Sequence, residues 1–74
     1  MKAKILKKRS GTRYFTEIQG KIFRFKDNKM EIFLRKKWVG SIRDINGYSN
    51  ELLLPIDWKE ISFLNAKQIK PEIF

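Results

Sequence analysis

The 74-residue sequence contains no cysteine and no histidine. The chain therefore cannot form disulfides, zinc sites built on Cys or His, or the thiolate and imidazole groups of many catalytic sites. Its serines have no histidine base to activate them, and its carboxylates form no recognisable catalytic pair or metal-ligand loop. A catalytic cleft is also difficult to build from so few residues, so we expect a protein that is not an enzyme and needs no cofactor.

Long apolar segments are missing too. No run of 18 apolar residues is present, so the sequence predicts no transmembrane helix. The basic segment 1–9 is not followed by an apolar stretch, and we expect no secretory signal. The lack of cysteine fits a reducing compartment, and we expect a cytoplasmic protein. The chain is long enough for one small basic domain, residues 1–74, which buries only about 60% of its unfolded surface.

Charge is distributed very unevenly along the chain, which has a net charge of +9. Residues 1–37 contain thirteen basic and three acidic residues, a net +10, whereas residues 38–74 contain four and five, a net −1. A low-GC coding bias can raise the number of lysines, but it does not explain why one half carries the whole excess. The asymmetry predicts a polyanionic partner, nucleic acid before membrane.

Residues 21–38 alternate in a way typical of two strands joined at a polar turn. Pairing Phe25 with Met30 through an Asp27–Asn28 turn, or with Ile32 through an Asn28–Lys29 turn, keeps apolar and basic side chains on separate faces. The apolar set, expected to face the core, is Phe23, Phe25, Met30, Ile32, Leu34 and Trp38. The opposite set is Ile22, Arg24, Lys26, Glu31, Phe33, Arg35 and Lys37.

Two further strands are predicted before this hairpin, at residues 2–9 and 12–19, because both segments are rich in residues that favour strands. Ser10–Gly11 between them is a turn signal. We expect Ile5 of the first strand and Ile18 of the second to face the core.

Glycines mark the other predicted changes of direction. Gly20 interrupts a nearly continuous β pattern and predicts a bulge or bend at which one long strand turns a corner, and Gly40 is a second such position. Asn46–Gly47 is typical of a type I′ hairpin turn. Residues 48–54 form the expected return strand, although the run Leu52–Leu54 fits a buried strand and a loop plug equally well.

The C-terminal part is predicted to contain a short helix over residues 58–68, ending before Pro71. Asp57 and Glu60 match a capping box, and the flanking isoleucines match a hydrophobic staple. The alternative is a single turn at 57–60 followed by a strand at 61–65. The apolar tail 71–74 either folds back onto the rest of the protein or inserts into a partner.

These elements predict a mainly β fold: a small, strongly bent antiparallel sheet or partly open barrel of four to five strands with a short C-terminal helix. The expected core is Ile5, Ile18, Phe23, Phe25, Ile32, Leu34, Trp38 and Trp58. Residues 20–34, with a glycine bend, an acid near the turn and an apolar strand, loosely resemble the first motif of Sm-like RNA-binding barrels. The glycine-to-acid spacing is one residue longer here and the Arg-Gly of the second Sm motif is missing, so the resemblance implies a small-barrel architecture only.

A basic surface with one exposed aromatic ring is the predicted functional site. Lys and Arg neutralise phosphates and release counterions, Arg can bind phosphate or guanine with two hydrogen bonds, and an exposed ring can stack on a base. The predicted nucleic-acid-binding residues are Lys7, Lys8, Arg9, Arg13, Arg24, Lys26, Phe33, Arg35 and Lys37. The alternative for Phe33 is that it packs beneath a loop or the C-terminal helix.

The sequence therefore predicts a DNA- or RNA-binding module and does not distinguish the two nucleic acids. The alternative is a small protein-binding module, such as an inhibitor or accessory factor from a mobile element, whose basic face docks on an acidic surface of a larger protein. An anionic membrane could also attract this charge, but no amphipathic helix supports that reading, and we expect no membrane partner.

Overall fold

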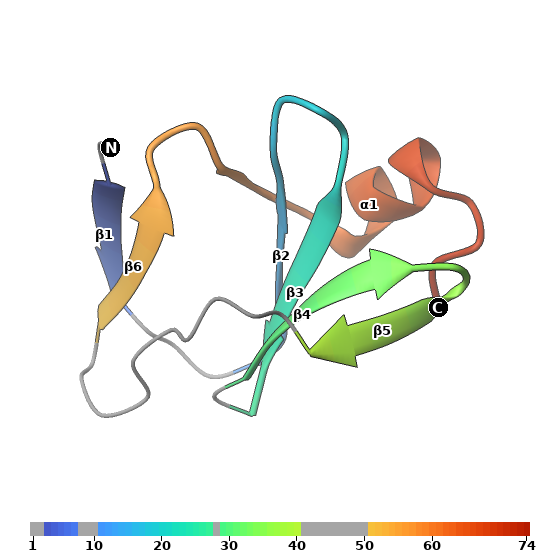
Figure 1. Ribbon diagram of the computed structural model, residues 1–74, viewed down its shortest axis with the longest axis horizontal. Coiled ribbons are helices and arrows are strands. Elements are labelled where there is room, and N and C mark those ends of the chain that lie inside the picture. The colour runs from blue at the N-terminus through green and yellow to red at the C-terminus, as the bar shows by residue number, and fades with distance from the viewer. Residues whose placement is uncertain (1–2, 8–10, 28, 41–50) are drawn as a thin grey trace.

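The computed structural model describes residues 3–7, 11–27, 29–40 and 51–74. In chain order these form strands β1 (Ala3–Lys7), β2 (Arg13–Thr16), β3 (Ile22–Lys26), β4 (Lys29–Leu34), β5 (Lys37–Gly40), β6 (Glu51–Pro55) and β7 (Lys59–Ile61), and helix α1 (Phe63–Ile69) (Figure 1). The mainly β fold with a short C-terminal helix confirms the predicted fold class.

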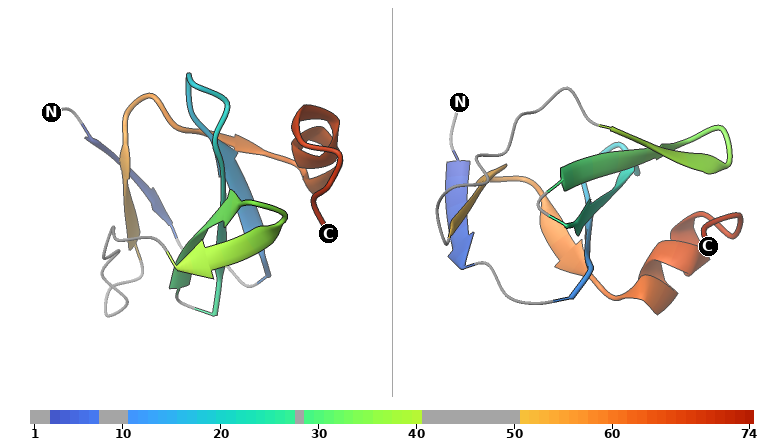
Figure 2. Two further views of the ribbon diagram at one scale, coloured as in Figure 1. Left: turned by 45° about the vertical axis from the view of Figure 1, so that its right-hand side comes forward. Right: turned by 90° about the horizontal axis from the view of Figure 1, so that it is seen from below.

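The strands form two antiparallel sheets. The larger sheet has the order β5-β4-β3-β2-β7, and the smaller one pairs β1 with β6. The small sheet lies on one side of the large sheet and α1 lies on the other (Figure 2). The sheets do not close into a barrel, and the described residues form seven strands where four to five were predicted.

The β3–β4 hairpin has one of the two predicted registers. Phe25 pairs with Met30 and Lys26 pairs with Lys29, so Asp27–Asn28 connects the strands. Asp27 has a φ of 52°, in the left-handed region that aspartate tolerates better than most residues. Phe25 and Met30 are both buried, which confirms this part of the predicted apolar face.

The β4–β5 hairpin was not anticipated, because its turn is the dipeptide Arg35–Lys36 rather than Asn-Gly. Both residues have positive φ, 51° and 66°, as a two-residue type I′ turn requires. The turn pairs Leu34 with Lys37 and Phe33 with Trp38. Paired residues share a face, so Trp38 joins Phe33 and Lys37 joins Leu34. The predicted faces of Lys37 and Trp38 are therefore wrong.

Gly20 closes a hairpin turn rather than bending one long strand, so the predicted corner is wrong. Thr16 pairs with Ile22, and the Gly20 N–H donates to the carbonyl of Glu17 at 2.9 Å. The φ of Gly20 is 87°, which explains the need for glycine. Gly40 ends β5. The residues expected after Gly40 and the Asn46–Gly47 turn lie outside the described residues, as does Ser10.

The first core lies between the two sheets. Trp58 stacks on Phe23 with ring centroids 3.9 Å apart, and Leu52 and Leu54 are fully buried, so 52–54 belong to a strand, β6, with one buried face and are not a loop plug. Lys4 donates a hydrogen bond from Nζ to the carbonyl of Trp58. The core members are Phe15, Phe23, Phe25, Met30, Leu52, Leu54 and Trp58, with Leu6 and Ile32 at the margin.

Three residues predicted for this core are exposed instead: Ile5 by 61%, Ile18 by 87% and Leu34 by 47%. In β1 the alternation is reversed, since Leu6 packs inward and Ile5 points outward. Ile18 lies in the turn after β2, and Leu34 is the last residue of β4. These three predictions failed because the hydrophobic pattern alone does not determine where a strand ends or which of its two faces points inward.

A second core covers the opposite face of the large sheet, where the sequence predicted an exposed basic surface. Ile22, Phe33, Ala66 and Ile73 are buried there. The main-chain oxygen of Phe74 accepts a hydrogen bond from the Trp38 indole at 3.3 Å. The tail thus folds back onto the sheet, which confirms the first of its two predicted alternatives.

Helix α1 begins later than predicted. Ser62 is its N-cap and accepts a hydrogen bond from the Asn65 N–H at 3.1 Å, and the helix ends at Ile69, before Pro71 as expected. The predicted start at Asp57 is wrong because Lys59–Ile61 pairs with β2 as β7. The alternative strand at 61–65 is wrong too, since the helix starts at residue 63. Strand pairing outweighs a local capping signal here.

We expect the substitution Ser62→Ala to lower the free energy of unfolding by about 1 kcal/mol, because it removes the N-cap hydrogen bond of α1. Asp57→Ala is the matched control, since Asp57 occupies the cap position that the sequence favours and is exposed. Its effect should stay within about 0.5 kcal/mol. Urea denaturation measures both values. A larger loss from Asp57→Ala than from Ser62→Ala would contradict the observed helix start.

Candidate nucleic-acid interface

The structure describes seven of the nine predicted binding residues. Lys8 and Arg9 lie outside the described residues. The other seven do not form one surface. Three of them are engaged in the fold, and four are exposed at two separate ends of the large sheet.

Arg13 is 6% exposed and held by three hydrogen bonds. Its Nε and Nη2 donate to the Glu60 carboxylate at 2.9 and 2.7 Å, and Nη1 donates to the Lys7 carbonyl at 2.7 Å. The hydrogen bond to Glu60 raises the pKa of Arg13 above its usual value, against the lowering effect of burial. The guanidinium therefore ties β2 to β7 and to the end of β1. The expectation that Arg13 offers free charge is wrong.

Arg24 is also used within the sheet. Its Nη2 lies 2.6 Å from Glu31 Oε1, and its Nε donates to the same oxygen at 2.8 Å. The guanidinium carbon lies 4.3 Å from the centre of the Trp38 ring, a cation–π contact. The side chain is 16% exposed, so most of its charge is balanced inside the structure. Arg24 stabilises the middle of the sheet and offers little to a ligand.

Phe33 is 4% exposed and cannot serve as a stacking platform. Its ring meets Trp38 edge-on at 5.1 Å and Phe74 at 6.3 Å, and it packs in the second core with Ala66. The predicted exposed aromatic is therefore wrong, and the alternative that Phe33 lies beneath the C-terminal segment is confirmed. The signal that could have shown this is Ile22, an apolar neighbour on the supposedly basic face.

One group of exposed cations, which we call the Lys26 end, comprises Lys7, Lys26 and Lys29. Lys26 and Lys29 face each other where β3 and β4 meet, at the lower edge of the sheet in Figure 1. Lys7 lies at the same end, because its carbonyl is bonded to Arg13, whose strand partner is Phe25. Lys29 was not among the predicted residues, since nothing in the sequence distinguishes it from other turn lysines.

The second group, which we call the Arg35 turn, comprises Arg35, Lys36 and Lys37. It lies at the other end of β4, beside the C-terminal segment (Figure 1). All three residues are exposed. Within the described part of the chain, none of their side chains forms an ion pair, a hydrogen bond or a ring contact. Arg35 and Lys37 were among the predicted residues and Lys36 was not, because the alternation predicts one strand through residues 30–38.

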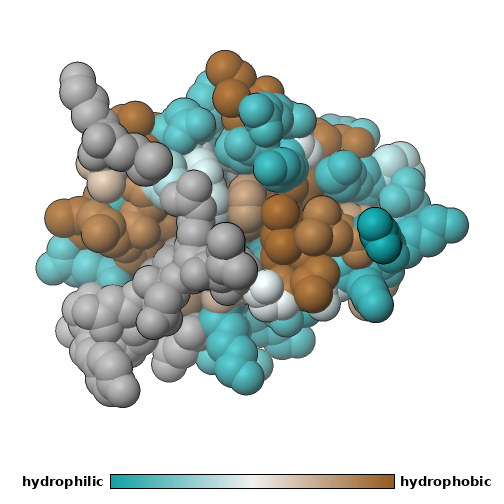
Figure 3. All heavy atoms as spheres, viewed as in Figure 1, coloured by the Kyte–Doolittle hydropathy of each residue, from teal (hydrophilic) through white to brown (hydrophobic). Residues whose placement is uncertain are grey.

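Apolar atoms accompany these cations. Figure 3 shows a hydrophobic area over β4 and β5, bordered by hydrophilic atoms. Leu34 is 47% and Val39 37% exposed, and both lie on the face that Lys37 shares. On the small sheet, Ile5 and Leu53 pair across the outer face, exposed by 61% and 60%.

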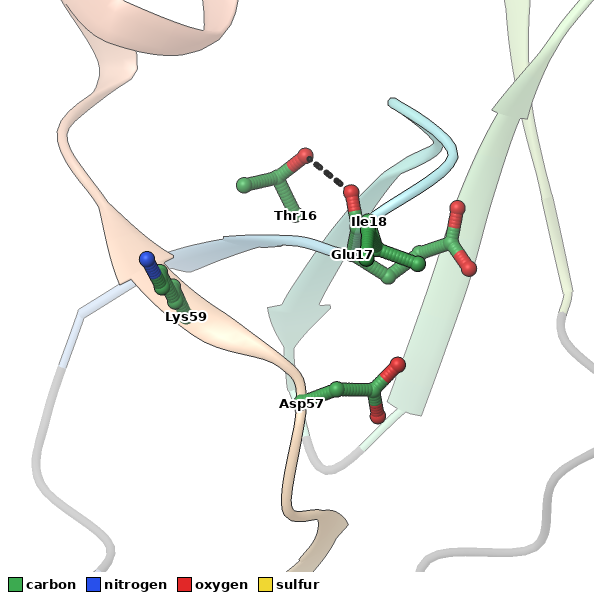
Figure 4. Close-up of a pocket in the computed structure, with 5 residues that line it drawn as sticks. All are labelled: Thr16, Glu17, Ile18, Asp57 and Lys59. Carbon is green, nitrogen blue, oxygen red and sulfur yellow. Dashed lines mark hydrogen bonds between the residues drawn. The ribbon is translucent and has the colours of Figure 1, made fainter.

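A cavity of about 400 Å³ lies between the turn after β2 and the segment that leads into β7 (Figure 4). Its lining residues are Thr16, Glu17, Ile18, Asp57 and Lys59. Glu17 Oε1 already accepts hydrogen bonds from the backbone of Gln19 and Lys21, at 3.0 and 3.2 Å. This carboxylate therefore stabilises its own turn.

Two further findings concern the described residues alone. No three acidic side chains among them gather closely enough to hold a metal ion. In the same ranges, no helix has both the length and the apolar character needed to cross a membrane.

We expect Arg13→Met to lower the free energy of unfolding by about 3 kcal/mol, because it removes the ion pair with Glu60 and the hydrogen bond that ties β2 to the end of β1. This loss is at the lower end of the range for buried ion pairs, because the side chain of Glu60 is 29% exposed. The double variant R13M/E60L should recover much of the loss. Lys7→Gln is the control, since Arg13 is bonded to the main-chain carbonyl of Lys7 and the residue is exposed, and it should change the value by less than about 0.5 kcal/mol. Thermal and urea unfolding check all three, and a near-neutral Arg13→Met would refute a structural role.

Comparisons with known proteins give no family for the chain. No protein-family model matches it, and no curated protein or solved structure matches it significantly. The loose resemblance to the first Sm motif therefore receives no support from relatives.

Proposed function

We propose that the protein is a nucleic-acid-binding module that contacts backbone phosphates through the exposed cations of its N-terminal half. The observation that carries this proposal is the separation of its charges. The acidic residues Glu31 and Glu60 balance the two arginines in the sheet, whereas the cations of the Lys26 end and the Arg35 turn face solvent. A fold that only needed solubility could spread its cations evenly, and this one concentrates them in one half.

The proposed mode of binding is electrostatic rather than aromatic. Phe33 is buried, so base stacking on this face of the sheet is not part of the proposal. Strand β4 connects the two cationic ends and is six residues long, about 17 Å at the rise of an antiparallel strand. Several phosphates of one strand fit along that length. Affinity should therefore depend strongly on salt and weakly on base sequence.

The proposal concerns binding and not catalysis, and it extends to a location in the cytoplasm. A cysteine-free, strongly basic chain fits a reducing compartment that contains nucleic acid. DNA and RNA both fit this proposal, because each presents backbone phosphates to the exposed cations.

A protein-binding module is the second candidate, favoured by the exposed apolar area beside the Arg35 turn. Leu34 and Val39 could pack against a larger protein while Lys37 meets an acidic residue of that protein. The variant L34S/V39S separates the two candidates. Nucleic-acid binding through phosphates should survive it, whereas recovery of a stoichiometric protein partner from nuclease-treated lysate should be lost.

We expect submicromolar binding to short nucleic acids, with affinity falling log-linearly as salt increases. The variant K26Q/R35Q/K37Q should reduce the slope of log affinity against log salt by about 2 to 3, since each lost phosphate contact contributes roughly 0.9 for duplex DNA. Fluorescence anisotropy with labelled single- and double-stranded DNA and RNA measures the slope.

The matched control is K59Q/K67Q/K70Q, which removes the same charge from the C-terminal half. Its slope should stay close to that of the unmodified protein. Equal effects from the two triple variants would mean that net charge alone causes the attraction, and binding that vanishes at physiological salt would reject the proposed function.

A further inference from the structure

In the Arg35 turn, residues with long side chains occupy a backbone conformation that normally favours glycine or asparagine. Arg35 and Lys36 both adopt left-handed backbone conformations, with φ of 51° and 66°. Residues with a β-carbon disfavour this region, and a two-residue hairpin turn of this type normally uses Asn-Gly. Elsewhere in the described ranges, positive φ occurs at Gly11, Gly20 and Asp27, which tolerate it better.

No contact within the described structure offsets this strain. The side chains of Arg35 and Lys36 are exposed and make no hydrogen bond, ion pair or ring contact with other described residues. Lys37 follows directly, so three like charges also repel one another at the turn. Neither local conformation nor electrostatics explains why the turn carries these residues, and strained backbone of this kind is often found at functional sites.

The hairpin residues next to the Arg35 turn are well packed. Phe33 and Trp38, the pair nearest to Leu34–Lys37 along the hairpin, meet edge-on at 5.1 Å, and Arg24 stacks on the Trp38 ring. The Trp38 indole is bonded to the main chain of Phe74. A turn supported in this way holds its cations in place before a ligand arrives, which reduces the entropy lost on binding.

We propose that the Arg35 turn is the principal phosphate-binding element of the protein, and that its strained conformation is retained because it presents three cations to one nucleic-acid backbone. This inference rests on the proposed function and assigns its main contact. The Lys26 end, where Lys26 and Lys29 face each other across the hairpin, acts as a secondary contact.

The test compares three double variants in the full chain. R35N/K36G relieves the strain and removes two charges, R35Q/K36Q removes the same charges without relieving the strain, and K26Q/K29Q removes two charges from the other end. Salt titrations use labelled duplex DNA and single-stranded RNA, and thermal unfolding is followed by circular dichroism. All three variants carry the same net charge, so differences between them report on position.

Both turn variants should lower the salt slope by about 2, and K26Q/K29Q by less than about 1. R35N/K36G alone should raise Tm, by at least about 4 °C. If the unmodified protein binds but R35N/K36G binds with an unchanged slope, or K26Q/K29Q has the larger effect, the inference is overturned while the proposed function stands. A Tm that does not rise in R35N/K36G overturns the argument from strain. If the unmodified protein does not bind at all, the proposed function itself has failed.

Discussion

Burial of both faces of the large sheet is the constraint on which the rest of this structure depends. Phe15 and Phe23 face the small sheet, whereas Ile22 and Phe33 face α1 and the tail. A chain of 74 residues has few other segments with which to cover two faces, so the C-terminal residues become part of the core. As a result, the flat faces of the sheet are occupied, and the hairpin ends are the places left for exposed charge.

Two arginines are used within the fold, whereas Arg35 and several lysines remain exposed. Arg13 and Arg24 lie in the sheet, where a planar guanidinium can bind a carboxylate through several hydrogen bonds and stack on a ring. Lys26 and Lys29, with compact and strongly hydrated ammonium groups, stand at a hairpin end in solvent. A count of basic residues therefore overstates the charge that a ligand can reach. A basic side chain that is already paired with a carboxylate in the fold is not available to bind a phosphate.

The sequence predicted the features that depend on local alternation and missed those that depend on distant partners. The pairing of Phe25 with Met30 was predictable because it keeps the apolar side chains of both strands on one face. The mainly β class was predictable from the many residues that favour strands. The Arg35–Lys36 turn carries no recognisable turn signal, and reading through it placed Lys37 and Trp38 on the wrong faces. The helix start at Asp57 and the free charge of Arg13 failed together, because Glu60 binds Arg13 from a strand and does not cap a helix.

The order of strand pairing has a consequence for how the chain folds. Strands β2 to β5 form successive hairpins between neighbours, so their contacts close short loops quickly. Two other pairings join segments far apart in the sequence: Ala3 pairs with Pro55 in the small sheet, and Tyr14 pairs with Ile61 where β7 joins β2. A folding nucleus in the hairpins of β2 to β5, completed late by the pairing of β6 with β1 and of β7 with β2, follows from this topology. Amide exchange should accordingly be faster in β1, β6 and β7 than in β2 to β5.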